Sequence, residues 1–233
     1  EVRGIFSPIW SKLRWRFSLS MTYTVKEIFY TLQGEGFFSG RAAVFCRFTG
    51  CNLWSGHEYH RDSAVCQFCD TDFLGTDGEG GGKFKSAKSL ADQIEMTWSQ
   101  GTNNQDSRFV VCTGGEPLLQ LDNSLITELH RRHFFVAVET NGTQDAPSDV
   151  DWLTVSPKAG TQLILERGDE LKLVHPQNGI NPESYENLNF DNFYLQPMDG
   201  PQLESNTEHV IEFCRRNPMW KVSLQTHKLL DIP

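Results

Sequence analysis

Short runs of apolar, β-branched and aromatic residues recur along the chain, and most of them end in a polar or glycine-rich turn. Runs of this kind are typical of short buried strands. The predicted strands cover residues 43–48, 109–112, 135–138, 153–155, 171–174, 193–195 and 221–224. Between some of them the apolar residues take helical spacing, which predicts helices over residues 86–99, 122–133 and 207–217. This alternation predicts a parallel sheet with crossover helices.

The helical pattern is weak between residues 156 and 193, so some crossovers are expected to be loops. An α/β fold that forms an incomplete (β/α) barrel, with reduced helical crossovers, fits this pattern best. In barrels and open parallel sheets, ligands bind where the carboxyl ends of the strands meet. The polar turns follow predicted strands and are therefore expected to share one site.

Composition is that of an ordinary globular protein. The 233 residues are 38% hydrophobic and 22% charged, and no clear linker divides them, which predicts a single domain over residues 21–233. The formal net charge of -9 argues against a nucleic-acid or anionic-membrane partner. No apolar run reaches the length of a membrane-spanning helix.

Residues 1–20 differ from the rest of the chain. They carry four basic residues against Glu1, a charge of +3, which leaves -12 for the remainder. The segment lacks the continuous apolar stretch and the cleavage site of a signal peptide. We expect an N-terminal extension with no catalytic role.

Three of the six cysteines, Cys51, Cys66 and Cys69, follow the spacing C-x14-C-x2-C. This clustering indicates a metal site in a reducing compartment, and the cytoplasm is the expected location. Three thiolates leave one coordination position open. Zinc would take a fourth ligand, for which His57 or His60 is available, whereas a [4Fe–4S] cluster would keep its fourth iron free for a cofactor or substrate. The spacing alone fits both.

A second motif favours the cluster. Residues 113–117 read Thr-Gly-Gly-Glu-Pro and follow a predicted strand. They resemble the Gly-Gly-Glu-Pro motif of radical S-adenosylmethionine (radical SAM) enzymes, in which this segment receives the amino group of methionine. Glycine allows close backbone approach, and Glu116 is expected to accept a hydrogen bond from the ammonium.

The cysteine spacing departs from the C-x3-C-x2-C usual in that superfamily. In its fourteen-residue loop the chain resembles the 7-carboxy-7-deazaguanine synthase family, some members of which share the expansion. The resemblance runs from residue 21 to residue 233. It is carried by TLQGEG at 31–36, RFTGCNLWSG at 47–56, CQFCDTDF at 66–73 and QTHK at 225–228. It implies an incomplete barrel of radical SAM type.

The resemblance also implies a reaction. In that family 6-carboxy-5,6,7,8-tetrahydropterin becomes 7-carboxy-7-deazaguanine with release of ammonia, on the route to queuosine and other deazapurines. An electron from the cluster cleaves S-adenosylmethionine, the resulting 5′-deoxyadenosyl radical takes the hydrogen from C6 of the pterin, and the ring contracts. The cofactor carries the difficult chemistry and the protein positions it.

Site residues carry over position by position. The cluster would be held by Cys51, Cys66 and Cys69. S-adenosylmethionine would contact Phe68, Gly115, Ser156, Pro157, Lys158, Gln196, Pro197, Met198 and Asp199. The pterin would contact Leu32, Gln33, Gly34, Arg47, Thr113 and Pro233, with Arg47 suited to a bidentate grip on a carboxylate. Glu139, Asn141 and Glu35 are weaker candidates.

Family members also use Mg²⁺ beside the substrate, and Thr71 matches the protein ligand, with Asp70 and Asp72 as outer groups. One hydroxyl together with water and substrate oxygens suits this cation, which keeps part of its hydration shell. The resemblance further implies an electron donor of flavodoxin or ferredoxin type and a homodimer.

Two alternatives stay open. Another radical SAM enzyme, such as an activase or a different heterocycle-forming lyase, would share the cluster and the glycine motif but not the Leu-Gln-Gly and C-terminal substrate features. A zinc-stabilised binding module without catalysis would have no affinity for S-adenosylmethionine.

Overall fold

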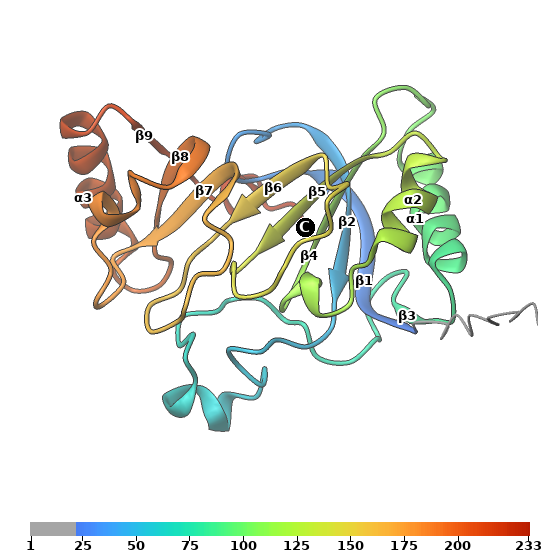
Figure 1. The fold of residues 1–233 in the computed structure, drawn as a ribbon, viewed down its shortest axis with the longest axis horizontal. Coiled ribbons are helices and arrows are strands. Elements are labelled where there is room, and N and C mark those ends of the chain that lie inside the picture. The colour runs from blue at the N-terminus through green and yellow to red at the C-terminus, as the bar shows by residue number, and fades with distance from the viewer. Residues whose placement is uncertain (1–21) are drawn as a thin grey trace, which may run out of the picture.

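The strand pattern of the sequence is realised in one nine-stranded sheet, ordered β3-β1-β2-β4-β5-β6-β7-β8-β9 (Figure 1). The structure is a computed structural model that describes residues 22–233, so the expected N-terminal extension lies outside the described residues. The strands are β1 (Tyr23–Leu32), β2 (Ala42–Phe48), β3 (Gly82–Phe84), β4 (Phe109–Gly114), β5 (Phe135–Thr140), β6 (Trp152–Val155), β7 (Arg167–His175), β8 (Asn189–Pro197) and β9 (Trp220–Val222). The helices are α1 (Ala87–Gly101), α2 (Asn123–His130), α3 (Leu203–Arg216) and α4 (Thr226–Leu230), with 3-10 helices η1 (Glu58–Ser63), η2 (Pro117–Leu119) and η3 (Pro182–Tyr185).

From β2 to β9, every neighbouring pair of strands runs parallel. The parallel sheet is thus confirmed. The end strands β3 and β9 pair with β1 and β8 and leave the sheet unclosed. An unclosed sheet with its strand ends on one side is the predicted incomplete barrel.

The three predicted helices are confirmed and cover the two ends of the sheet. Helix α1 begins after a capping box at Ser86 and buries Leu90, Ile94 and Trp98 on one face. In Figure 1, α1 and α2 lie together beside β1 and β2, and α3 lies beside β8 and β9. Loops join β5 to β6 and β6 to β7, which confirms the reduced crossovers.

Strand β1 was not predicted from the apolar pattern, and a β-bulge explains why. β1 pairs antiparallel with β2, and the register shifts between Val25 and Glu27. Val25 and Ile28 are buried in the core, so the inward positions change from odd to even across the bulge. Lys26 and Glu27 consequently both reach the opposite face.

Candidate active site

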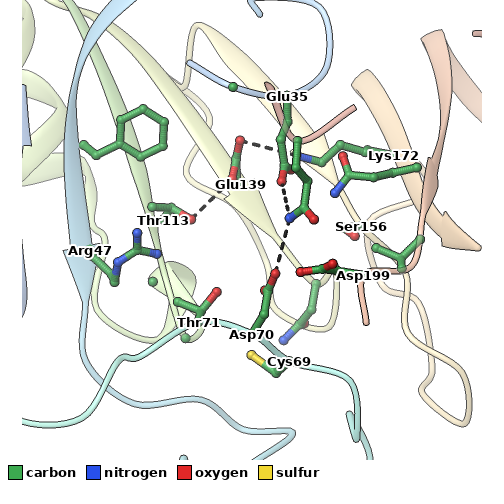
Figure 2. Close-up of a pocket in the computed structure, with 18 of the residues that line it drawn as sticks. Glu35, Arg47, Cys69, Asp70, Thr71, Thr113, Glu139, Ser156, Lys172 and Asp199 are labelled. Atoms are coloured by element: carbon green, nitrogen blue, oxygen red, sulfur yellow. Dashed lines mark hydrogen bonds and ion pairs between the residues drawn. The ribbon is translucent and has the colours of Figure 1, made fainter. Parts of the chain in front are cut away.

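The carboxyl ends of the parallel strands surround one cavity of about 390 Å³. Figure 2 shows side chains from several strand ends and from the cysteine segment directed into it. The predicted site residues on its wall are Leu32, Gln33, Gly34, Arg47, Cys51, Cys66, Phe68, Cys69, Thr71, Thr113, Gly115, Ser156, Lys158, Gln196, Pro197, Met198, Asp199 and Pro233. The expectation that the strand-end turns share one site is confirmed.

The three clustered cysteines all line this cavity. Cys51 follows the end of β2, and its Sγ accepts a hydrogen bond from the Leu53 N–H at 3.4 Å. Cys66 and Cys69 lie on an irregular segment after η1. The structure therefore brings to one cavity two thiols, Cys51 and Cys66, that fourteen intervening residues separate in the sequence.

The pKa values of the three thiols are shifted in different directions. A hydrogen bond from Cys66 lowers the pKa of Cys69, and the same interaction raises the pKa of Cys66. Burial raises the pKa of Cys51. Because the thiolate is the metal-binding form, Cys69 is the most readily available ligand of the three.

The histidines that would complete a zinc site do not line the cavity. His57 and His60 lie at η1 and are exposed, and His60 Nδ1 is 2.9 Å from Ser55 Oγ. Within residues 22–233, no three His, Cys, Asp or Glu side chains are grouped where one metal ion could bind. A [4Fe–4S] cluster does not require three ligands around one metal ion, since each of three thiolates binds a different iron. Cys51, Cys66 and Cys69 therefore suit a cluster better than a single zinc ion.

The glycine turn after β4 brings backbone against backbone. A Cβ at Gly114, which has φ of +134°, would lie 2.2 Å from the Phe48 carbonyl oxygen, and one at Gly115 would lie 2.1 Å from the Gly50 oxygen. Only glycine fits at both positions. The turn therefore packs directly on the residues that precede Cys51.

Glu116 has a structural role, which corrects the expectation that it receives an ammonium. Its carboxylate is fully buried and accepts hydrogen bonds from Thr140 Oγ1 at 2.7 Å, the Asn141 N–H at 2.8 Å and the Leu118 N–H at 3.0 Å. Burial raises the pKa of this carboxyl, and these bonds oppose the shift. Glu116 fastens the end of β5 to the glycine turn and does not line the cavity.

The segment after β6 directs two of its three predicted site residues into the cavity. Ser156 and Lys158 line the cavity, whereas Pro157 between them is buried away from it, as extended backbone alternates its side chains. The Pro157 side chain is therefore directed away from the cavity, and the contact of this residue with S-adenosylmethionine stays a prediction. Lys158 Nζ donates to Ser156 Oγ at 2.7 Å and lies 6.0 Å from the centre of the Phe68 ring. Burial lowers the pKa of Lys158.

A buried lysine with three acidic neighbours forms the sheet side of the cavity, as Figure 2 shows in part. Lys172 on β7 is 5% exposed, pairs with Glu35 and lies 3.6 Å from Glu139 Oε1. Glu139 also accepts from Gln33 Nε2 at 3.0 Å. Burial alone would lower the pKa of Lys172, but Glu139, Glu35 and Glu170 raise it above its usual value.

Glu35 is held ionised by this arrangement. Burial would raise its pKa, but Lys172 and Gln225 outweigh burial and lower it. Buried charges are tolerated only when they are paired and hydrogen-bonded. The cavity thus offers fixed carboxylate acceptors beside a fixed ammonium.

Arg47 lies at another part of the wall and is already oriented. Its Nε donates to Glu27 Oε1 at 2.7 Å, and its guanidinium carbon lies 5.9 Å from the centre of the Phe29 ring. The rings of Phe29 and Phe45 stack at 5.6 Å and line the same wall. A flat ligand would meet an apolar surface with a cation at its edge.

The segment after Cys69 is held by two lysines. Lys228 on α4 bridges Asp70, at 2.6 Å, and Asp199. Lys26 pairs with Asp72 at 2.9 Å. Both aspartates beside Thr71 are therefore engaged by cations, and the Thr71 side chain lines the cavity between them.

The C-terminal segment completes the wall. The Pro233 oxygen accepts a hydrogen bond from Thr31 Oγ1 at 2.9 Å. The Gly34 carbonyl accepts from the Thr226 N–H at 2.9 Å, and a Cβ on Gly34 would lie 2.2 Å from His227 Nδ1. The absence of a side chain at Gly34 is what lets α4 approach.

Sequence reasoning missed several lining residues, chiefly Lys26, Glu27, Phe29 and Lys172. The signal for Lys172 was present, because a lysine inside an apolar strand of a parallel sheet is rare unless paired. Lys26 and Glu27 gave no signal, since β1 itself was not recognised.

Comparisons with known proteins show the family of this chain. No protein-family model matches the chain. The chain is similar to 7-carboxy-7-deazaguanine synthase of Caulobacter vibrioides, at 58% identity over 213 residues, which cover 91% of this chain and 100% of that protein. It is 56% identical to the protein of the same name from Burkholderia multivorans, with the same coverage. The crystal structure of QueE from Escherichia coli has a TM-score of 0.64 and 27% identity, covering 87% of this chain and 93% of that one. With full-length relatives at this identity, the chain belongs to the 7-carboxy-7-deazaguanine synthase family.

Proposed function

We propose that this protein is a radical SAM lyase that converts 6-carboxy-5,6,7,8-tetrahydropterin to 7-carboxy-7-deazaguanine and ammonia, in queuosine and deazapurine biosynthesis. One observation carries the proposal. The three cysteines, the glycine turn and the residues expected to contact the pterin all line one cavity of about 390 Å³. The names of the relatives support the same reaction.

The residues present fit the cluster and S-adenosylmethionine. Cys51, Cys66 and Cys69 would hold the cluster, and the side-chain-free Gly115 would let the methionine end approach the backbone. When bound, these groups supply the 5′-deoxyadenosyl radical that takes the hydrogen from C6 of the pterin. Phe68 and Lys158 would orient the nucleoside, and the turn at 196–199 would close over it.

The pterin would be oriented by the other side of the cavity. Arg47 would bind its carboxylate through the two terminal nitrogens, because Nε is bonded to Glu27. The ionised Glu35, with Glu139 and the Pro233 carbonyl oxygen, would accept hydrogen bonds from the amino and ring N–H groups. Leu32, Gln33, Gly34 and Thr113 would hold the ring plane between these charges.

Thr71 would bind Mg²⁺ beside the substrate. The flanking aspartates are paired with Lys228 and Lys26, which leaves the Thr71 hydroxyl as the protein oxygen offered to the cation. A hard cation with one protein ligand would complete its octahedron with water and substrate oxygens. Chelation of Mg²⁺ should therefore lower turnover without releasing iron.

The remaining parts of the proposal concern partners and place. A flavodoxin or ferredoxin would supply the electron, and the protein would act as a homodimer. The six cysteines, all within the described residues, are free thiols, which supports a reducing compartment such as the cytoplasm. None of the helices formed by the described residues has the length and apolar character needed to cross a membrane.

Anaerobic turnover tests the proposal. The protein is reconstituted with iron and sulfide, and dithionite, S-adenosylmethionine, Mg²⁺ and 6-carboxytetrahydropterin are added. Mass spectrometry should detect the deazaguanine, and Cys66→Ala should abolish both iron binding and product. Cys214→Ala, which alters a cysteine on α3 outside the cavity wall, is the matched control.

Two other outcomes of this experiment would contradict the proposed function, one in part and one entirely. A brown protein that cleaves S-adenosylmethionine and leaves the pterin intact would keep the radical class and discard the reaction. A colourless protein that retains zinc would contradict both.

A further inference from the structure

One side chain of the fourteen-residue loop between Cys51 and Cys66, that of Arg61, contacts the backbone of the segment that carries Cys66 and Cys69. Most of η1 is exposed, including Tyr59 at 76%. Arg61 differs, with its side chain 26% exposed. Its Nη1 donates to the carbonyl oxygens of Gln67, at 2.9 Å, and Cys69, at 3.1 Å.

These two carbonyls lie on either side of Phe68, between the two cysteines of the C-x2-C pair. The segment from Cys66 to Leu74 has no helix or strand, so no backbone ladder fixes it. Hydrogen bonds from a charged donor are stronger than those between neutral groups. One guanidinium nitrogen thus ties together the backbone that carries both thiols.

The guanidinium is itself held on two further sides. Its carbon lies 4.1 Å from the centre of the Trp54 ring. Its Nε and Nη2 bind the two carboxylate oxygens of Glu58. Because its Nη1 is hydrogen-bonded to the backbone of Gln67 and Cys69, the guanidinium holds its positive charge beside the segment that carries both thiols.

We propose that Arg61 is a positioning residue for the iron–sulfur cluster: it fixes the turn that carries Cys66 and Cys69, and its charge raises the reduction potential of the cluster. This inference rests on the proposed function only in assuming that the three cysteines bind the cluster. Reduction adds one electron from the donor to the cluster, and a nearby cation stabilises that added negative charge. Glu58 partly offsets the cation, so the potential depends on the pair.

The midpoint potential of the reconstituted cluster tests the electrostatic part, with pterin and S-adenosylmethionine left out. An EPR-monitored redox titration should give a more negative potential for Arg61→Gln and a more positive one for Glu58→Gln. Arg61→Lys should stay near the wild-type potential, since it keeps the charge. Arg215→Gln is the matched control, because Arg215 is exposed on α3 and, among the described residues, its ion pair is with Glu212 of the same helix, at 3.6 Å.

Hydrogen exchange of the cluster-free protein tests the positional part. Residues 66–70 should exchange about tenfold faster in both Arg61→Gln and Arg61→Lys, because neither side chain keeps the forked contact. A wild-type potential and wild-type exchange in Arg61→Gln would overturn the proposal. If that variant does not fold, an unchanged potential in Glu58→Gln together with unchanged exchange in Arg61→Lys would overturn it. Because neither readout involves the pterin, failed turnover would count against the proposed function alone.

Discussion

The two sides of the cavity are built by different means. The sheet side, formed by Gln33, Thr113, Glu139 and Lys172, takes its positions from strands and strand ends whose register is fixed, such as Arg47 opposite Thr113. The loop side, residues 66–72, has no regular secondary structure. It is held by individual cations, namely Arg61, Lys26 and Lys228.

This difference indicates which kind of change each side tolerates. On the sheet side a substitution cannot move the backbone, so it leaves an unpaired buried charge where the partner was. On the loop side most of the ion pairs reach solvent, and each contributes little by itself. We therefore expect large, all-or-none effects on the sheet side and graded effects on the loop side.

The largest effect is expected for Lys172→Met. It leaves Glu35, Glu139 and Glu170 without their shared cation, and removing one partner of a buried ion pair typically costs about 3–5 kcal/mol. Urea unfolding at pH 7 should show this loss. Lys221→Met, which removes an exposed lysine bonded to Asn192, should unfold like the wild type.

The same variant has a distinct pH dependence. In the wild type the lowered pKa of Glu35 means that its stabilising contribution is present above about pH 4.3, the unfolded value, and is lost as the pH falls below it. In Lys172→Met, Glu35 and Glu170 lose the cation that lowers their pKa values, so protonation of these two carboxyls at acid pH reduces the destabilisation of the variant. The difference in the free energy of unfolding should shrink from pH 7 to pH 5, and a constant difference would contradict the ion-pair explanation.

Glu116→Gln is the next largest change. The amide has one acceptor oxygen where the carboxylate has two, so at least one of the bonds to Thr140, Asn141 and Leu118 is lost, at about 1–3 kcal/mol. Binding of S-adenosylmethionine, measured by calorimetry, should change less than twofold. A tenfold loss of affinity with unchanged stability would restore Glu116 as the ammonium acceptor.

Gly34→Ala tests the contact between the sheet side, at Gly34, and helix α4. The new Cβ would displace His227 and with it α4, and a misplacement of this size should lower kcat/KM for the pterin about tenfold. Gly82→Ala is the control, since among the described residues its Cβ would meet the Phe84 ring at 3.8 Å, an ordinary van der Waals contact. Adding His227→Gly to Gly34→Ala should recover part of the structural change, visible as restored exchange protection of α4.

The smallest effect is expected for Lys228→Met on the loop side. It removes the bridge between Asp70 and Asp199, and a pair this exposed is worth at most about 1 kcal/mol. The dissociation constant for S-adenosylmethionine should rise no more than about fivefold, and high salt should reproduce the change in the wild type. A complete loss of binding would make the two sides equivalent and refute the comparison.

The fold could be predicted from the sequence wherever the apolar residues of a segment keep one regular spacing. Helix α1 and the parallel strands keep their spacing, whereas β1 changes parity at Val25 and Glu27 and therefore shows no single period. For the site, the rule on strand ends predicted one cavity correctly. The buried side chain of Pro157 could not be predicted from the strand ends alone, because adjacent side chains of an extended segment point in opposite directions. Lys172 was missed although a lysine inside an apolar strand was a signal, because Glu35 and Glu139, which pair with it, come from distant parts of the sequence.

The bulge in β1 has a consequence for how this strand can change in length. Deleting Lys26 would remove the extra residue and leave Tyr23, Val25 and Ile28 in one unbroken inward alternation, so the core face would survive. The same deletion at Phe29 or Tyr30 would turn the following residues over and place Thr31 on the wrong side of the sheet. Among natural relatives, single-residue gaps in this strand should therefore fall at position 26 and be accompanied by loss of the acid at position 72.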